Sequence, residues 1–289
     1  MPRGRYRTEG VCVILVTGAN GNVGAEVVRA LSEAGEPVRA LVRAADRPAP
    51  AGVEGVVGDL NEPATLAPAL ARVSGLFLLP GYRDMPGLLA EAARAGVRRV
   101  VLLSGGSAGD GDMSNAVSRY MILSEVAVRD SGLPWTILRP AAFMSNAFRW
   151  LPQLCAGDVV RVPFATVRTA TVDPYDIGRV AARALLTDGH EGQVHYPTGP
   201  QSLLPEEQIR TLGEVLGRKL ACVPLSNEEA RAEMTGTMPA DYVDAFFRFY
   251  VDGTLDESQV RPTVQEVTGQ APRTFAQWAA AHASGFAQS

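Results

Sequence analysis

The hydrophobic positions of this chain fall into short apolar runs separated by amphipathic stretches. Six runs have the length and the β-branched content of buried strands: 11–16, 38–42, 53–57, 75–79, 98–103 and 133–138. Helical patterns follow at 25–35, 86–96 and 115–131, and a further helix is expected near residue 61. Strands that alternate with helices favour right-handed βαβ units. The pattern therefore predicts an α/β fold built on a doubly wound parallel sheet.

The pattern is less regular after residue 140. It predicts helices at 142–154, 175–186, 205–216 and 238–250, and short strands at 158–162, 168–172, 194–196 and 221–224, and the segment 275–286 closes the chain. We expect a smaller C-terminal α/β lobe from this half of the chain. The aromatic residues within 238–250 fit either a core or the lining of a pocket.

The first apolar run leads directly into a glycine-rich turn. In the stretch VTGANGNVG the glycines are Gly18, Gly21 and Gly24, and a helical pattern follows at once. Gly18 permits a sharp turn, Gly21 lets the backbone approach a pyrophosphate, and Gly24 packs the helix against the strand. The positive end of the helix then attracts the anion. This arrangement is typical of the dinucleotide-binding turn of a Rossmann fold, although an ordinary βα turn has the same outline.

The end of the second apolar run bears on the type of dinucleotide. NAD-binding proteins place an Asp or Glu about 20 residues beyond the first glycine, where it binds the ribose 2′-hydroxyl. The run here ends at Arg43, with no carboxylate. Arg43 can pair with a 2′-phosphate, assisted by Arg39 or Arg47, so the sequence favours NADP(H) over NAD(H). The alternative is that these are solvated surface arginines.

Two polar residues directly follow predicted parallel strands, at the edge of the sheet where ligands bind. Asp59 either accepts a hydrogen bond from the adenine amino group or caps the helix expected near residue 61. Ser104 either hydrogen-bonds a substrate carbonyl or ends the strand. Ser104 also begins a glycine-rich loop, SGGSAGDGDMSN, whose composition suits a loop that folds over a ligand.

Composition argues against several other classes of protein. The net charge of −4 disfavours nucleic acid as the main partner. Cys12, Cys155 and Cys222 are scattered without a CxxC pair, which indicates reduced thiols and a cytoplasmic location. The three histidines lack metal-ligand spacing, so no metal site is predicted. No run approaches the ~18 apolar residues that a membrane span needs. The oligomeric state stays open.

The motifs together resemble the NmrA-like, NAD(P)H-binding group of atypical short-chain dehydrogenase/reductases. The resemblance rests on VTGANGNVG with its GxxGxxG spacing, VRALVR, VVGDL, SGLPWTILRPAAFMSN at 131–146, and the tail VTGQAPRTFAQWAAAHASGF at 267–286. It covers nearly the whole chain. Its motifs are specific for fold and cofactor, whereas the functions of the group diverge widely.

The resemblance implies a domain organisation and a set of cofactor contacts. A disordered lead-in over 1–10 precedes an NADP-binding Rossmann domain over 11–140, which also takes in returning segments. A mainly substrate-binding lobe over 141–289 is partly interleaved with it, and the active site is expected in the cleft between them. The implied contacts are Gly18, Asn20, Gly21, Asn22, Val23, Gly24, Arg43, Asp59, Leu60, Leu79, Pro80 and Ser104, with Pro140 and Phe143 near the nicotinamide.

One departure from the family concerns its catalytic pair. Most members carry YxxxK on the helix after the fifth strand, where the Tyr donates a proton to the carbonyl oxygen and the Lys lowers the Tyr pKa. Many also place a Glu four residues after the Lys and fourteen before an Arg-Pro pair. Glu125 lies fourteen residues before Arg139, so Val117 stands at the Tyr position and Met121 at the Lys position. Tyr120 lies nearby, on a neighbouring part of the helix face.

The resemblance leaves two functions to weigh. The first is an NADP(H)-dependent ketoreductase, of the kind found in antibiotic pathways. It transfers hydride to a ketone or quinone of a bulky, aromatic polyketide-like substrate that assists its own protonation. Ser104 and Tyr120 are its candidate catalytic residues. The second is a non-catalytic NADP(H)-binding redox sensor of the NmrA type. A sugar-nucleotide epimerase is disfavoured, because such enzymes use the missing Tyr and Lys.

Overall fold

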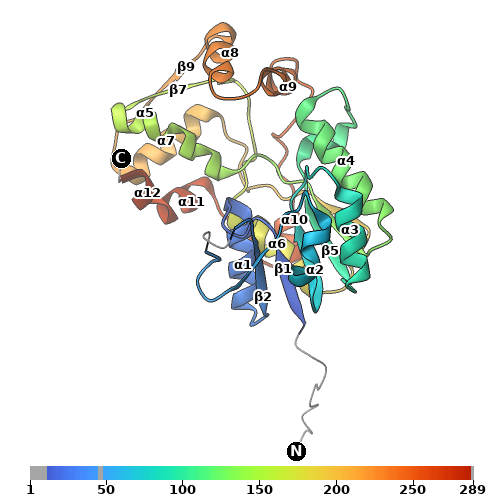
Figure 1. Ribbon diagram of the computed structural model, residues 1–289. Helices are drawn as coiled ribbons and strands as arrows, with labels where there is room; N and C mark the ends of the chain where they lie inside the picture. Colours follow the sequence, from blue (N-terminus) through green and yellow to red (C-terminus); the bar gives the residue numbers. More distant parts are fainter. Residues whose placement is uncertain (1–11, 45–47, 288–289) are drawn as a thin grey trace, which may run out of the picture. The chain divides into compact units, whose positions relative to one another are not determined.

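The predicted parallel sheet is present in the computed structural model, which describes residues 12–44 and 48–287. Within these residues the sheet has seven strands in the order β3-β2-β1-β4-β5-β6-β8 (Figure 1). The pairs β1–β2, β2–β3, β1–β4 and β4–β5 are parallel. The strand bounds are Val13–Val16, Val38–Val42, Glu54–Val57, Val73–Leu78, Arg99–Leu103, Trp135–Leu138 and, for β8, Gln193–His195. The order reverses beside β1, as in doubly wound dinucleotide-binding folds, so the predicted fold class is confirmed.

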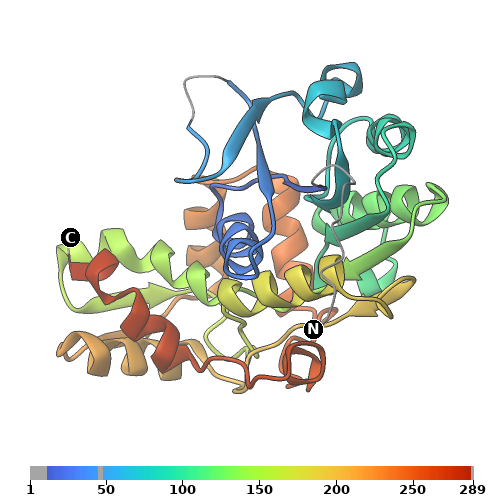
Figure 2. The same cartoon turned by 90° about the horizontal axis from the view of Figure 1, so that it is seen from below.

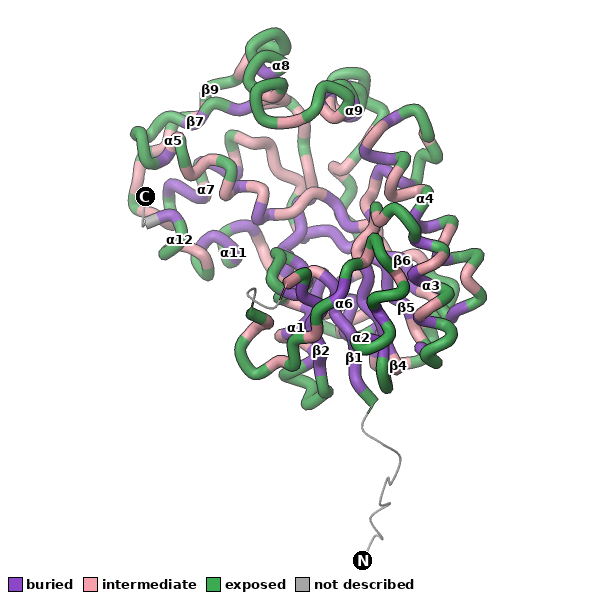
Figure 3. Tube along the Cα trace, viewed as in Figure 1, coloured by how far each residue is buried: buried purple, intermediate pink, exposed green. Residues whose placement is uncertain are grey.

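Burial along the strands follows their position in the sheet. Every residue of β1 and β2 is buried, whereas β3, at the edge of the sheet, is largely exposed (Figure 3). The central strands read as continuous apolar runs because both of their faces are covered. The helices that follow the strands are α1 (Asn22–Glu33), η1 with α2 (Pro63–Leu66 and Ala67–Leu70) and α3 (Met85–Arg94).

The chain divides into two compact units that interleave along the sequence. Unit 1 comprises Met1–Leu103, Ser124–Ile137 and Ala181–Gln193, and unit 2 comprises Ser104–Leu123, Leu138–Val180 and Val194–Ser289. Helices α4 (Ala116–Asp130) and α6 (Pro174–Leu186) each contain a point at which the chain passes from unit 2 to unit 1. The lead-in predicted over 1–10 lies outside the described residues.

Unit 2 has its own core. Helix α7 (Pro205–Leu216) lies beside α11 (Phe275–Ala281) and α12 (Ala283–Ala287), as Figure 2 shows. Trp278 and Phe286 are fully buried there and pack around Phe148. The other elements of unit 2 are η2 (Gly106–Asp110), η3 (Met144–Trp150), α5 (Leu151–Ala156), β7 (Val159–Val162), β9 (Ala221–Pro224), α8 (Asn227–Thr235), α9 (Ala240–Tyr250) and α10 (Thr263–Thr268). Strands β7 and β9 form a separate parallel pair.

Several predicted elements of the second half were wrong in detail. The strand expected at 168–172 is reduced to single bridges at Thr169 and Val172. The helix expected at 142–154 begins only at Met144 and is a 3₁₀ helix until α5 starts at Leu151. In unit 1, the helix expected near residue 61 begins as a 3₁₀ turn at Pro63.

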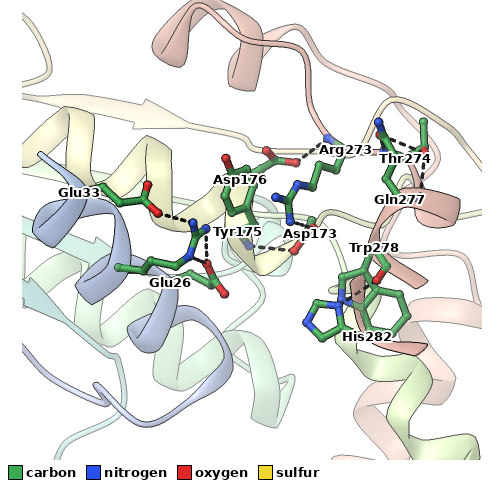
Figure 4. A network of polar contacts seen from close by, with 11 residues as sticks. Glu26, Glu33, Asp173, Tyr175, Asp176, Arg273, Thr274, Gln277, Trp278 and His282 are labelled. Atoms are coloured by element: carbon green, nitrogen blue, oxygen red, sulfur yellow. Dashed lines mark hydrogen bonds and ion pairs between the residues drawn. The ribbon is translucent and has the colours of Figure 1, made fainter. Parts of the chain in front are cut away.

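Helices α8 and α10 were not predicted at all. Helix α8 is short and polar, so it lacks the apolar periodicity on which the prediction relied. Its start nevertheless carries a sequence signal, since Ser226 and Glu229 form a capping box, in which the Ser226 hydroxyl accepts the N–H of Glu229. The same signal opens α11, where Thr274 and Gln277 cap each other (Figure 4).

A buried polar cluster ties the first turn of α6 to the segment before α11 (Figure 4). The backbone N–H of Arg273 donates to Asp176 Oδ2 at 2.8 Å, and the Arg273 guanidinium lies 3.4 Å from the ring centroid of Tyr175. That guanidinium also pairs with Asp173 at 3.4 Å. Asp176 is fully buried, and its Oδ1 has no hydrogen-bond partner among the described residues. Burial is the main reason that its pKa is raised to about 6.

This cluster predicts a pH dependence of stability. A carboxyl whose pKa is raised on folding binds its proton more tightly in the folded state, so it destabilises the fold as pH rises from about 4 through about 6. A shift of about two units corresponds to roughly 3 kcal/mol. We expect Asp176→Asn to remove most of this dependence from urea-unfolding free energies measured between pH 4 and pH 7. The exposed Asp252→Asn should leave the dependence unchanged, and equal pH profiles for wild type and Asp176→Asn would contradict the assignment.

Candidate functional site

The glycine turn of unit 1 is closely packed. Gly18 has φ +64°, and a Cβ there would stand 2.5 Å from Leu79 Cδ1. A Cβ on Gly24 would stand 2.0 Å from the carbonyl oxygen of Gly18. Gly24 therefore packs the helix against the turn's own backbone, and not against the strand as the sequence suggested. Both positions require glycine.

The N-terminus of α1 lies at this turn and is open to an anion. Its N-cap is Gly21, which provides no side-chain cap, and the first turn contains no acidic residue. The first N–H groups of a helix have no intrahelical partner, and they lie at the positive end of its dipole. A helix start that glycines leave uncovered fits the phosphates of a dinucleotide. Of the other predicted contacts here, Val23 is buried in α1, Asn22 begins it, and the Asn20 side chain donates to the carbonyl of Pro48.

The ends of the neighbouring strands bring further predicted contacts to the same edge of unit 1. The Thr17 hydroxyl accepts the N–H of Leu79 at 3.0 Å, which holds the end of β4 to β1, with Pro80 next in the chain. Arg43 is exposed directly after β2. Asp59 Oδ1 accepts the N–H of Asn61 at 2.8 Å and so closes a turn, with Leu60 between them.

Tyr82 is a residue of this edge that sequence reasoning missed. Burial raises its pKa, the charge of Arg43 acts to lower it, and the charge of Asp59 acts to raise it. The Tyr82 hydroxyl is therefore within electrostatic range of both predicted contacts. No periodicity marks Tyr82; its only sequence signal is its position just after the fourth strand.

The proposal that Arg39 assists in cofactor binding is wrong. Arg39 is buried in β2, where its guanidinium donates to the carbonyls of Ala69 and Ala71, both at 2.8 Å, and pairs with Glu54. It binds the backbone at the end of α2, and four of its five N–H groups are used by these carbonyls and by Glu54. Arg47 lies outside the described residues.

In unit 2, backbone hydrogen bonds bring three predicted residues together. The N–H of Ser104 donates to the carbonyl of Leu138 at 2.7 Å, and the N–H of Gly106 donates to the carbonyl of Pro140 at 3.2 Å. Phe143 pairs with Val172 in a parallel bridge. Ser104, Pro140 and Phe143 thus lie along two adjoining segments, and the Ser104 side chain is buried.

The part of α4 in unit 2 provides no Tyr–Lys pair. Val117 is buried against Ala245 and Phe249 of α9. The sulfur of Met121 lies 2.7 Å from where a Cβ on Gly105 would stand, and the Ser107 hydroxyl donates to that sulfur at 3.8 Å. Tyr120 packs against the same cluster, and burial raises the pKa of its hydroxyl. The positions of the usual catalytic pair are therefore occupied by packing residues.

The described part of the chain lacks two further features. No group of three or more His, Cys, Asp and Glu side chains in residues 12–44 and 48–287 is arranged to hold a metal ion. None of the helices in the same ranges is both long enough and apolar enough to cross a membrane.

Comparison with known proteins decides the family. The sequence model of a family described as NAD(P)H-binding matches residues 18–190, more than half of the chain. The chain belongs to this NAD(P)H-binding, NmrA-like family of atypical short-chain dehydrogenase/reductases.

Relatives extend the match to the whole chain. A (4-alkanoyl-5-oxo-2,5-dihydrofuran-3-yl)methyl phosphate reductase from Streptomyces griseus subsp. griseus is 40% identical over 95% of this chain and 99% of its own. An NAD(P)H azoreductase from Xenophilus azovorans is 36% identical over 95% and 99%. A solved structure described as a nucleoside-diphosphate-sugar epimerase from Staphylococcus aureus has a TM-score of 0.78 at 18% identity, covering 93% of this chain and 99% of that one. That structure shows the fold alone.

The family and the relatives confirm the predicted family, cofactor class and enzyme class. This family member is an NADP(H)-dependent oxidoreductase. The individual contacts and the substrate stay predictions.

The glycine turn yields a direct test. Gly24→Ala places a methyl group against the Gly18 carbonyl, which has no room to move without breaking the turn. We expect a loss of on the order of 3 kcal/mol in the free energy of unfolding and a large loss of NADPH affinity, measured by quenching of protein fluorescence. Gly236→Ala is the matched control, since its φ is −72° and its nearest neighbour would be 3.5 Å away. Equal stability and NADPH affinity in the two variants would contradict the packing argument.

Proposed function

We propose that this protein transfers hydride from NADPH to a conjugated carbonyl acceptor, a ketone or quinone of a bulky, aromatic polyketide-like compound, without the usual Tyr–Lys pair. The observation that carries the proposal is the packing of Val117 and Met121, which leaves α4 without a hydroxyl or an ammonium group at the expected positions. Action in the cytoplasm and in antibiotic biosynthesis belongs to the same proposal.

The cofactor contacts follow from the two sets of residues described above. In unit 1 the glycine turn and the start of α1 would hold the pyrophosphate, Arg43 the 2′-phosphate and Asp59 the adenine, beside Leu60, Leu79 and Pro80. In unit 2 Ser104, Pro140 and Phe143 would lie near the nicotinamide. Residues 11–140 would then supply most of the NADP-binding domain, and 141–289 most of the substrate-binding lobe.

The absence of the Tyr–Lys pair limits which acceptors the protein can reduce. NADPH, when bound, supplies the hydride; the chain must position the acceptor, exclude water and provide for the charge that develops on oxygen. A conjugated ketone or quinone spreads that charge over its own π system, and an adjacent phenol neutralises it internally. Such an acceptor depends least on a protein proton donor, whose loss typically costs ~10²–10⁴-fold in rate. The names of the two relatives support reduction as the reaction and differ from each other in the acceptor.

A non-catalytic redox sensor, the alternative that the sequence left open, is compatible with the absence of the pair, but the two relatives are named as reductases. Loss of NADPH absorbance with a panel of phenolic ketones and quinones separates the two. Turnover of any member supports the reductase. Firm NADP(H) binding without turnover of any of them, together with a transcription regulator bound in a redox-dependent way, supports the sensor.

Arg43 provides a test of cofactor selection. Arg43→Ala removes the cation proposed to bind the 2′-phosphate, and a hydrogen bond to a charged group is worth about 1.5–3 kcal/mol. We therefore expect the Kd of NADPH to rise by roughly ten- to a hundredfold and that of NADH to change little. Arg210→Ala, at an exposed arginine of α7, should leave both Kd values unchanged. An equal effect of Arg43→Ala on the two cofactors would contradict 2′-phosphate recognition.

Tyr120 provides a test of the mechanism. Tyr120 packs between α4 and α9, which fits a structural role. Tyr120→Phe should retain turnover within about threefold, because loss of a true proton donor costs roughly 10²–10⁴-fold. A loss of several hundredfold in a variant that still binds NADPH would identify Tyr120 as the donor.

A further inference from the structure

We propose that Tyr250 of α9 donates the proton to the acceptor, with Glu257 and Arg149 as its positioning residues. The proposal rests on the reductase function proposed above. It assigns the donor to an element other than the helix that carries it in most family members.

The side chains of Tyr250 and Glu257 are joined directly. The Tyr250 hydroxyl donates to Glu257 Oε2 at 2.8 Å. The Tyr250 ring is held by Phe164, with ring centroids 5.2 Å apart, and by Phe246 of its own helix. The backbone carbonyl of Glu257 accepts the N–H of Ala170. Both members of the pair are therefore fixed by contacts within unit 2.

The pair lies beside the segment expected at the nicotinamide. The backbone N–H of Ala142 is close enough to the Glu257 carboxyl to act on its pKa. Ala142 stands between Pro140 and Phe143, the two residues that the family resemblance places near the nicotinamide ring. Its own carbonyl accepts the N–H of Val172, which fixes the segment. All of these residues belong to unit 2.

Charged groups act on the pKa of both members of the pair. Burial and Glu257 raise the pKa of Tyr250 well above its usual value, and the charge of Arg149 acts against them. The Arg149 Nε donates to the carbonyl of Asn146 at 3.3 Å. Burial and Asp256 raise the pKa of Glu257, against Tyr250 and the Ala142 N–H, which lower it. Glu257 therefore keeps its proton to a higher pH than an ordinary glutamate does.

Reduction of the acceptor consumes one hydride and one proton. Hydride from NADPH adds to the acceptor, and the electron pair of the carbonyl π bond moves to oxygen. The Tyr250 O–H proton passes to that oxygen, the Glu257 carboxyl proton passes to the Tyr250 oxygen, and water returns a proton to Glu257. The acceptor is reduced by two electrons, NADPH is oxidised to NADP⁺, and the 2.8 Å contact carries the proton between the two side chains.

The test compares two quinones that differ in their own proton donor, 1,4-naphthoquinone and 5-hydroxy-1,4-naphthoquinone. Rates are expressed per NADPH-binding site, so that loss of folded protein does not count as loss of catalysis. We expect Tyr250→Phe to lower kcat on the plain quinone by roughly 10²-fold or more, and on the hydroxylated quinone by less than tenfold. Tyr242→Phe, on the same helix, is the control and should change neither rate.

Glu257→Gln and Arg149→Met test the positioning roles by pH profile. With wild type, kcat on the plain quinone should fall as pH rises, because Glu257 loses its proton. Glu257→Gln should lower kcat and abolish this dependence, and Arg149→Met should lower kcat on the plain quinone more than on the hydroxylated one.

The outcomes separate the relay from the reductase function. Rates for Tyr250→Phe within twofold of wild type on both quinones, or reduced equally on both, overturn the relay and leave the reductase standing. A wild-type pH profile in Glu257→Gln overturns the role of Glu257. If wild-type protein that binds NADPH turns over neither these two quinones nor any other member of the panel, the proposed function fails and the relay fails with it.

Discussion

The carbonyl oxygen of Gly18 determines how closely the first helix approaches the turn before it. It occupies the space that a side chain on Gly24 would need, and Gly18 itself adopts a left-handed conformation. This close approach places the uncapped start of α1 at the carboxyl end of β1, where we propose that the phosphates of the dinucleotide bind. Arg43, Asp59 and Tyr82 gather at the same edge of unit 1. The proposed phosphate site in this unit therefore depends on a contact between two backbone segments.

A second constraint acts on the chemistry. Val117 and Met121 are committed to packing, against α9 and against Gly105, so α4 cannot supply the usual acid. Tyr250, at the C-terminal end of α9, donates a hydrogen bond to Glu257, and the charge of Arg149 acts on its pKa. The proposed relay keeps the elements of the family's pair, a phenol and a nearby cation, and adds a carboxyl group with a raised pKa.

The arginines show where sequence reasoning succeeded and where it did not. Arg39 and Arg43 lie on the same short stretch, and both were plausible partners for a 2′-phosphate. Arg39 points into the sheet and satisfies the carbonyls of Ala69 and Ala71, thirty or more residues away, whereas Arg43 is exposed just beyond the strand. In the second half, strand pairing at 168–172 was overestimated because only Thr169 and Val172 find bridge partners. Helix α8 was not predicted because it is short and polar and lacks apolar periodicity, although its capping box marks its start.

The sequence by itself determined the order of strands and helices in the first half, the parallel sheet and the glycine turn, and the family resemblance indicated the absence of the Tyr–Lys pair. These features are set by periodicity and spacing along the chain, which act over a few residues. Only the tertiary structure decided that Arg39 is structural, that Tyr82 joins Arg43 and Asp59, that Asp176 is buried with a raised pKa, and that Tyr250, Glu257 and Ala142 meet. Burial and charge depend on segments far apart in sequence, which are brought together only when the chain folds.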